Sequence, residues 1–227
     1  MIGPRKQAGF TLVELMIALV LGLIVIAAVI NMYVGSSRSS TFTTGLQTMQ
    51  ENGRYGVSAL QRGFRLAGFS PTERIDPVDV AKSGSDSITV VMQREFDCNG
   101  INTATSSRPG FAINTYALDT NTSTITCEGS GAGAVPMPLV EGVDSFRVLY
   151  GLDTDDDQVP ESYVTHDPGM PANQIVGIRF ALLVNSGIEI RSRPSAEQHV
   201  VLDEVVPKDD RFTRHVFSST VMLRNRL

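Results

Sequence analysis

The feature that most constrains this chain is an apolar stretch close to its N-terminus. Residues 15–30 contain no charged or strongly polar side chain, and with its apolar flanks the stretch covers residues 10–34. Its length of about 25 residues exceeds the roughly 20 that a helix needs to cross the hydrocarbon of a bilayer. The only charges ahead of it are Arg5 and Lys6. The positive-inside rule therefore predicts one membrane span, with its start in the cytoplasm and residues 35–227 exported.

The residues before the apolar stretch differ from an ordinary secretory signal. Such a signal has an apolar core of about 7 to 15 residues, followed by a small-residue cleavage site. Here the small residues Ala8 and Gly9 precede the apolar stretch. Cleavage after Gly9 would remove a leader of residues 1–9 and keep the helix, so we expect the helix to serve the mature protein.

The segment Gly9–Leu15 (GFTLVEL) resembles the processing motif of type IV pilins and type II secretion pseudopilins. The motif is specific, because a basic leader, a glycine, a phenylalanine, a glutamate and a long apolar run all coincide. The resemblance implies that a prepilin peptidase cuts between Gly9 and Phe10 and methylates the new N-terminal amine of Phe10. The alternative is a plain membrane anchor that matches the motif by chance.

Glu14 is the only charged residue within residues 10–34. A carboxylate inside a spanning helix costs about 2.5 to 3.5 kcal/mol on insertion scales, so it usually has a partner. In assembled pili, the corresponding glutamate is thought to pair with the N-terminal amine of a neighbouring subunit. The resemblance implies that Glu14 sets the axial register between packed helices in this way. The other interpretation is that Glu14 is solvated at the level of the lipid headgroups.

Residues 35–69 are predicted to continue the spanning helix as an amphipathic helix. No proline interrupts residues 5–70, so we expect a nearly continuous helix over residues 10–66, on the order of 85 Å at 1.5 Å per residue. Gly35 and the serine-rich residues 36–40 lower the helix propensity, which predicts a bend or local melting near Gly35. The less polar positions recur every three or four residues and predict one buried face. They are Leu46, Met49, Gly53, Val57, Leu60, Phe64 and Ala67.

Residues 70–227 are predicted to form a head of β-strands. Short apolar and β-branched runs alternate with clusters of Gly, Asn, Asp and Pro, which is the pattern of strands joined by turns. The predicted fold class is α+β, the pilin fold, in which an antiparallel sheet packs on the second half of the long helix. The predicted strands cover residues 87–92, 111–118, 123–127, 146–150, 176–182, 199–206 and 214–223, and residues 129–138 form a predicted low-complexity loop.

The two cysteines of the chain, Cys98 and Cys127, lie in the predicted head. An exported domain meets an oxidising compartment, where cysteines form disulfides. A disulfide between them would close a loop of roughly 30 residues and stabilise the fold by about 3 to 4 kcal/mol in the chain-entropy model. Two free thiols are the alternative.

The charge of the mature chain argues against nucleic acid as a partner. Removal of Arg5 and Lys6 with the leader changes the formal net charge from -5 to -7. An acidic body attracts nucleic acid and anionic lipid poorly.

The acidic loop at residues 153–161 (DTDDDQVPE) is a candidate calcium site. Its first, third and fifth positions match the start of the calcium loop D-x-[DN]-x-[DN]-G. The sixth position is Gln158 instead of glycine and the twelfth is Val164 instead of glutamate, which excludes an EF-hand. Two interpretations remain open, a solvated acidic turn between strands and a simpler site that holds the loop rigid for a neighbouring subunit. The ligands of such a site would be Asp153, Asp155, Asp157 and Glu161.

The sequence contains no catalytic constellation, and we expect a protein that is not an enzyme. It has no G-x-S-x-G elbow and no P-loop. Residues 129–134 (GSGAGA) fit a dinucleotide fingerprint, but prolines follow where a helix should begin. No cofactor is predicted beyond the calcium considered above. The histidines, His166, His199 and His215, lie in no metal-ligand spacing, and the basic residues near the C-terminus, Lys208, Arg211, Arg214, Arg224 and Arg226, are interpreted as solvated charges.

Three further segments resemble the PilW-like minor pilins: residues 66–69 (LAGF), 143–153 (VDSFRVLYGLD) and 221–226 (VMLRNR). The resemblance implies a minor pilin of a tip complex that primes assembly of a type IV pilus and supports twitching motility, adhesion or DNA uptake. It implies a bacterial inner-membrane protein with a periplasmic head that later enters the pilus fibre. The expected partners are prepilin peptidase, other minor pilins, the major pilin and, before assembly, the lipid of the cytoplasmic membrane. Two alternatives are a J-type pseudopilin of a type II secretion system and a tip adhesin or DNA-binding receptor.

Overall fold

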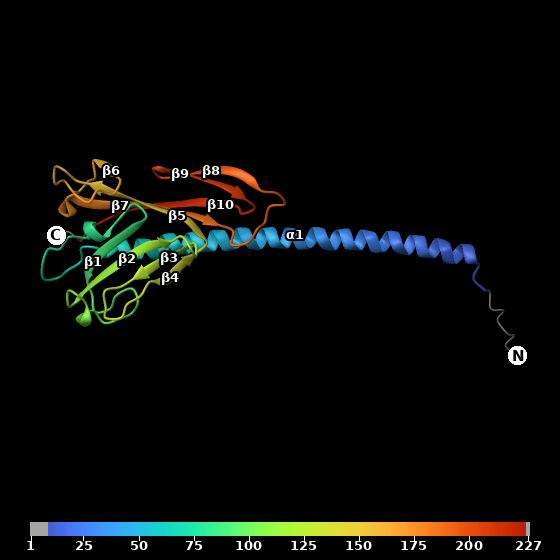
Figure 1. Cartoon of the computed structure of the whole chain (residues 1–227), viewed down its shortest axis with the longest axis horizontal. Helices are drawn as coiled ribbons and strands as arrows, with labels where there is room; N and C mark the ends of the chain where they lie inside the picture. The colour runs from blue at the N-terminus through green and yellow to red at the C-terminus, as the bar shows by residue number, and fades with distance from the viewer. Residues whose placement is uncertain (1–8, 226–227) are drawn as a thin grey trace. The chain divides into compact units, whose positions relative to one another are not determined.

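The computed structural model describes residues 9–225 of the chain (Figure 1). Within these residues, one α-helix, α1 (Leu12–Arg65), precedes ten strands and three short 3₁₀ helices. The chain divides into two compact units, Met1–Thr44 and Gly45–Leu227. The second unit therefore holds the last turns of α1 together with every strand.

In the first unit, α1 begins with a capped turn. Thr11 accepts a hydrogen bond on its Oγ1 from the backbone N–H of Glu14 at 3.2 Å, and its carbonyl oxygen accepts one from Leu15 at 3.2 Å. This is the geometry of an N-cap residue. The helix then continues through Gly35 and residues 36–40, so the prediction of local melting there is wrong. A glycine inside a helix costs only about 0.5 to 1 kcal/mol, which a long cooperative helix tolerates.

The second unit contains two four-stranded antiparallel sheets and a two-stranded hairpin. The first sheet has the order β1-β2-β3-β4, with β1 (Ser87–Gln93), β2 (Phe111–Asp119), β3 (Thr124–Glu128) and β4 (Met137–Glu141). The second has the order β10-β7-β5-β6, with β5 (Val143–Leu152), β6 (Ser162–Val164), β7 (Ile175–Asn185) and β10 (Arg214–Met222). β8 (Ser195–Val201) and β9 (Glu204–Asp210) form the hairpin, and the 3₁₀ helices are Val80–Lys82, Thr103–Thr105 and Ala172–Gln174. The α+β class with an antiparallel head is confirmed, although the head has two four-stranded sheets and a separate hairpin where one sheet was predicted.

The last turns of α1 join the two sheets through a shared core. Phe64 is fully buried, and its ring contacts Tyr116 of β2 and Phe180 of β7 edge-on, with centroid distances of 5.5 and 5.3 Å. Gly53 lets β10 approach the helix closely, because an added Cβ would lie 2.2 Å from the ring of Phe217. The predicted buried face is confirmed: Met49, Gly53, Leu60, Phe64 and Ala67 are buried, and Leu46 and Val57 pack against the core.

The prediction of one strand over residues 199–206 is wrong. The chain turns at Leu202, which has a φ of 56°, and Val201 pairs with Glu204 across the hairpin. The pattern misleads because an apolar run continues on both sides of the turn and Leu-Asp carries no strong turn signal.

Two strands leave no clear signal in the sequence. β4 contains Pro138, which marks a loop by composition but is tolerated on an edge strand that pairs on one side only. β6 has three residues, too few for a period to be visible. The remaining predicted strands of the head all occur, with boundaries shifted by a few residues.

The β8–β9 hairpin lies beside β7 and β10 and is fixed there by ion pairs (Figure 1). The Arg214 side chain is only 5% exposed. Its Nε donates a hydrogen bond to Asp144 Oδ2 at 2.5 Å. Its two Nη atoms donate to the carboxylate of Asp210, at 2.7 and 2.5 Å. Arg147 of β5 donates to Asp203 at the hairpin turn at 2.6 Å. The bonds from these arginines lower the pKa of Asp210 and of Asp203. The prediction that Arg214 is a solvated charge is therefore wrong.

Candidate functional site

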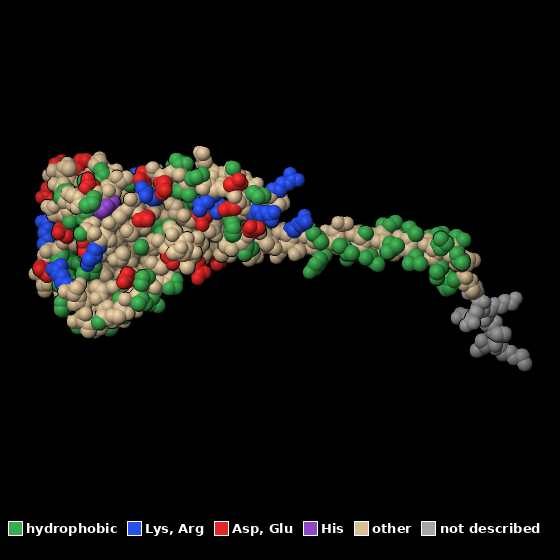
Figure 2. Space-filling model, viewed as in Figure 1, with side chains coloured by type: hydrophobic (Ala, Val, Ile, Leu, Met, Phe, Trp, Pro, Cys, Tyr) green, Lys and Arg blue, Asp and Glu red, His purple; other side chains and the backbone are tan. Residues whose placement is uncertain are grey.

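The first unit exposes an apolar helical surface without any packing partner among residues 9–225. Every residue from 9 to 44 is exposed, and this includes large side chains such as Leu12 and Phe10, which are 75% and 85% exposed. Figure 2 shows these apolar side chains along the N-terminal helix. Within the described residues, α1 is the one helix long and apolar enough to cross a membrane. Such a surface requires lipid or other protein helices to cover it.

The residues of the predicted processing motif lie at the start of this helix. Gly9 and Phe10 precede α1 without regular structure, and Glu14 lies in its first turn. The N-terminus of a helix carries partial positive charge, which favours a carboxylate there. The spacing of Thr11 and Glu14 is that of a capping box, a helix-start signal that is visible in the sequence. The predicted leader charges, Arg5 and Lys6, lie outside the described residues.

The predicted disulfide is present and ties the loop after β1 to β3. The Sγ atoms of Cys98 and Cys127 are 2.04 Å apart. Next to it, the carboxylate of Asp97 accepts backbone hydrogen bonds from Ile101 at 2.9 Å and from Gly131 at 2.8 Å. The disulfide and Asp97 together hold two loops that are distant in sequence against one edge of the head.

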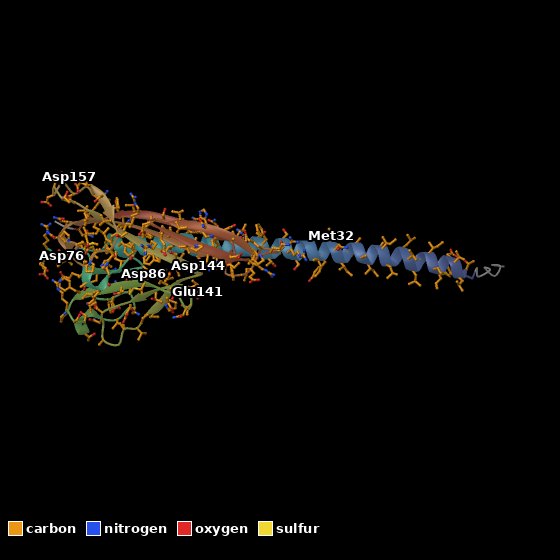
Figure 3. The ribbon with its side chains drawn as sticks, turned by 45° about the horizontal axis from the view of Figure 1, so that its top comes forward. Met32, Asp76, Asp86, Glu141, Asp144 and Asp157 are labelled. Carbon is orange, nitrogen blue, oxygen red and sulfur yellow. A yellow bond between two sulfur atoms is a disulfide. The ribbon has the colours of Figure 1, made fainter. Side chains whose placement is uncertain are left out.

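The structure brings the four predicted metal ligands together. One oxygen from each of Asp153, Asp155, Asp157 and Glu161 lies within 4.8 Å of the others. Asp153 is buried, and its two oxygens accept the backbone N–H groups of Asp156 at 2.6 Å and Gln158 at 2.8 Å. The loop stands at one end of the head, where Figure 3 labels Asp157.

The electrostatics of this loop are those of crowded carboxylates. Partial loss of hydration raises the pKa of Asp155, and the negative charge of Asp157 raises it further. The backbone N–H of Thr154, which donates to Glu161 at 2.8 Å, lowers the pKa of Glu161. A set of carboxylate oxygens at this spacing suits a hard cation such as calcium. The acidic loop could therefore hold a metal ion.

The three histidines stand in separate places and form no common site. His166 shares a hydrogen bond with the carbonyl oxygen of Val80 at 3.0 Å. His215 stacks edge-on against Phe217 with a centroid distance of 4.9 Å. His199 lies in the hairpin, where burial lowers its pKa. Within residues 9–225, none of them belongs to the cluster of possible metal ligands.

Comparisons with known proteins match both parts of the chain. The prokaryotic N-terminal methylation motif matches residues 4–30. Among solved structures, a type IV-like pilin from Thermus thermophilus is similar, with 16% sequence identity, a TM-score of 0.48, and coverage of 78% of this chain and 97% of that chain. The comparison with curated proteins finds no match. The family model for type IV pilus-assembly protein W, PilW, matches residues 111–225, just over half of the chain. The chain therefore belongs to the PilW family of type IV pilus-assembly proteins.

Proposed function

We propose that the protein is a minor pilin that primes assembly of a type IV pilus as part of a tip complex. Prepilin peptidase cuts it between Gly9 and Phe10 and methylates Phe10, and the head lies on the periplasmic side of the inner membrane. The observation that carries the proposal is the fully exposed apolar helix of residues 12–34, which begins within a methylation motif matched over residues 4–30, in a chain of the PilW family. The family is one of structural proteins that assemble with other pilins.

The proposed mechanism is the transfer of one apolar helix from lipid into a bundle of pilin helices. The free energy of the apolar side chains changes little in this transfer, because lipid and protein cover them equally well. The Glu14 carboxylate is the group whose free energy differs between the lipid bilayer and the helix bundle. Cleavage after Gly9 places a positive amine on Phe10, one helical turn from Glu14. In the bundle, the Glu14 carboxylate of one subunit pairs with the Phe10 amine of the next, which aligns the helices along the fibre axis.

The substitution Glu14→Gln tests this mechanism in the native bacterium. We expect it to lower the amount of the protein in the sheared pilus fraction at least tenfold relative to the membrane fraction, because truncating one partner of a desolvated charge pair costs about 2 to 5 kcal/mol. Immunoblots of the two fractions measure the ratio. The matched control is Glu141→Gln, an exposed carboxylate of the head labelled in Figure 3, which should leave the ratio unchanged. Equal incorporation of Glu14→Gln and wild type would contradict the pairing.

Co-purification from membranes separates the minor pilin from its alternatives. The full-length protein, captured in detergent, should bring along other minor pilins and the major pilin. Recovery of type II secretion components would assign it to the J-type pseudopilins instead. Tight binding of DNA to the same preparation, with a steep dependence on salt, would favour the DNA receptor.

We further propose that the acidic loop binds calcium weakly. Extracellular calcium sites have dissociation constants of about 10⁻⁴ to 10⁻³ M, so 5 mM calcium should raise the melting temperature of the full-length protein by roughly 3 to 5 °C. The double variant Asp155→Asn/Asp157→Asn should lose this shift, while Asp209→Asn, an exposed aspartate of the hairpin, should keep it.

Because the pKa of Asp155 is raised, the effect of calcium on the melting temperature should weaken as the pH falls toward 4. Equal melting temperatures with calcium and with EDTA would contradict calcium binding and would mean that the loop is a solvated turn.

A further inference from the structure

A groove of about 330 Å³ lies in the second unit, between α1 and the sheet β1-β2-β3-β4. Its volume is at the lower end of the range of about 300 to 1,000 Å³ that is typical of ligand sites. Tyr55 and Arg62 of α1 line one side, and Arg94 and Phe96 of the loop after β1 line the other, next to the Cys98–Cys127 disulfide.

Two hydrogen-bond donors that belong to largely buried residues line the groove and remain accessible at its surface. Asn114 and Tyr116 of β2 are each only 5% exposed. The Oδ1 of Asn114 accepts the backbone N–H of Cys98 at 3.1 Å, which leaves its NH₂ group as a donor. Neither this NH₂ group nor the Tyr116 hydroxyl makes a hydrogen bond with another of the described residues, and burial raises the pKa of Tyr116 to about 12, so its hydroxyl keeps its proton. Among the described residues, the one buried side-chain atom without a partner is His199 Nε2, so both of these donors are open to water in the groove, where an acceptor from outside the chain can take the place of that water.

The Tyr116 hydroxyl is held in place by its surroundings. Its ring packs edge-on against Phe64, with centroids 5.5 Å apart. At Gly63, an added Cβ would lie 2.4 Å from the Tyr116 oxygen. The absence of a side chain at Gly63 therefore leaves the room in which the hydroxyl lies, beside the groove.

The charges around the groove favour an anion. Arg62 and Arg94 are exposed, and neither forms an ion pair within residues 9–225; the one side-chain bond of Arg62 goes to the Ser58 hydroxyl at 2.6 Å. The one acid in the lining, Asp97, is buried and is occupied by backbone N–H groups. Two cations and two neutral donors thus line one groove.

The rims of the groove are apolar and accessible. Tyr55 is 52% exposed and Phe96 is 50% exposed. The rest of the apolar lining comprises Ala59, Leu66, Met92 and Leu139. A small anion would leave both aromatic rings in water. An occupant that covers them must carry apolar side chains on each side of its charge.

We propose that this groove binds an acidic segment of a partner protein. A carboxylate of the segment takes hydrogen bonds from Tyr116 and Asn114 and lies between Arg62 and Arg94. Apolar side chains beside that carboxylate pack on Tyr55 and Phe96. This assigns a recognition surface and its chemistry beyond the proposed role of the N-terminal helix, and it does not depend on Glu14.

Titration calorimetry with a matched pair of peptides tests the proposal. The probes are acetyl-Phe-Glu-Phe-amide and acetyl-Phe-Gln-Phe-amide, added to the full-length protein in non-ionic detergent. We expect the glutamate peptide to bind at least about tenfold more tightly than the glutamine peptide, because hydrogen bonds to a charged group are among the stronger ones. Tyr116→Phe keeps the ring and removes the hydroxyl, and Arg94→Gln removes one cation. Each should weaken binding of the glutamate peptide by about tenfold.

The controls separate this site from general effects of charge and folding. Arg193→Gln changes an exposed arginine outside the groove and should bind both peptides as the wild type does. The melting temperatures of Tyr116→Phe and Arg94→Gln should stay close to that of the wild type, which shows that the fold is intact. Equal affinity for the two peptides, absence of binding by either, or wild-type affinity in both groove variants would overturn the proposal. None of these outcomes bears on incorporation of the Glu14 variant into pili.

Discussion

Replacement of Phe64 by alanine is expected to lower the free energy of unfolding of the second unit by about 3 to 5 kcal/mol. Phe64 is fully buried on α1 and contacts Tyr116 of one sheet and Phe180 of the other. The substitution leaves a cavity at the point where the helix and both sheets meet. The surrounding rings cannot close this cavity without moving the sheets toward each other.

Urea unfolding of the full-length protein in detergent, followed by tyrosine fluorescence, measures this loss. The control Phe69→Ala removes a ring of the same size that is 43% exposed, and it should cost less than half as much. Equal losses for the two variants would mean that Phe64 does not join the sheets as described.

The second large effect concerns the buried ion pair under the hairpin. Arg214→Met should destabilise the second unit by about 3 to 5 kcal/mol, because it leaves a buried carboxylate without its cation. That carboxylate belongs to Asp144, whose side chain is 8% exposed. Among residues 9–225, its one other side-chain donor is the neutral amide of Asn185, at 3.0 Å. Methionine keeps most of the apolar packing of the arginine side chain. The loss in the free energy of unfolding therefore measures the effect of the missing charge.

A double variant separates the buried charge from packing. Asp144→Asn/Arg214→Met should recover a substantial part of the lost free energy, because it removes the unpaired charge. Arg193→Met, at an exposed position, should change stability by less than about 0.5 kcal/mol. A double variant as unstable as Arg214→Met would contradict this explanation, and urea unfolding measures all three.

The parts of the fold that follow a simple period are predictable from the sequence. The buried face of α1 follows from apolar residues at steps of three and four, and β7 follows from alternating Val176, Ile178, Phe180 and Leu182. The four carboxylates of the acidic loop are also predictable as a group, because a short loop confines residues close in sequence. Local patterns determine each of these features.

The rest depends on contacts between distant segments. Arg214 is one of several arginines near the C-terminus, and only the pairing of β10 with β7 places it beside Asp144. Asn114 and Tyr116 follow the ordinary alternation of a strand, and their role as donors depends on where α1 crosses the sheet. No local pattern contains this information.

The proposed function requires that the apolar helix is retained after the chain is cut behind Gly9 and then enters the pilus. Mass spectrometry of the protein isolated from sheared pili tests it most directly. We expect a chain that begins at Phe10 and carries one methyl group on its α-amine. A chain that still holds residues 1–9, or one that lacks the apolar helix, would contradict it.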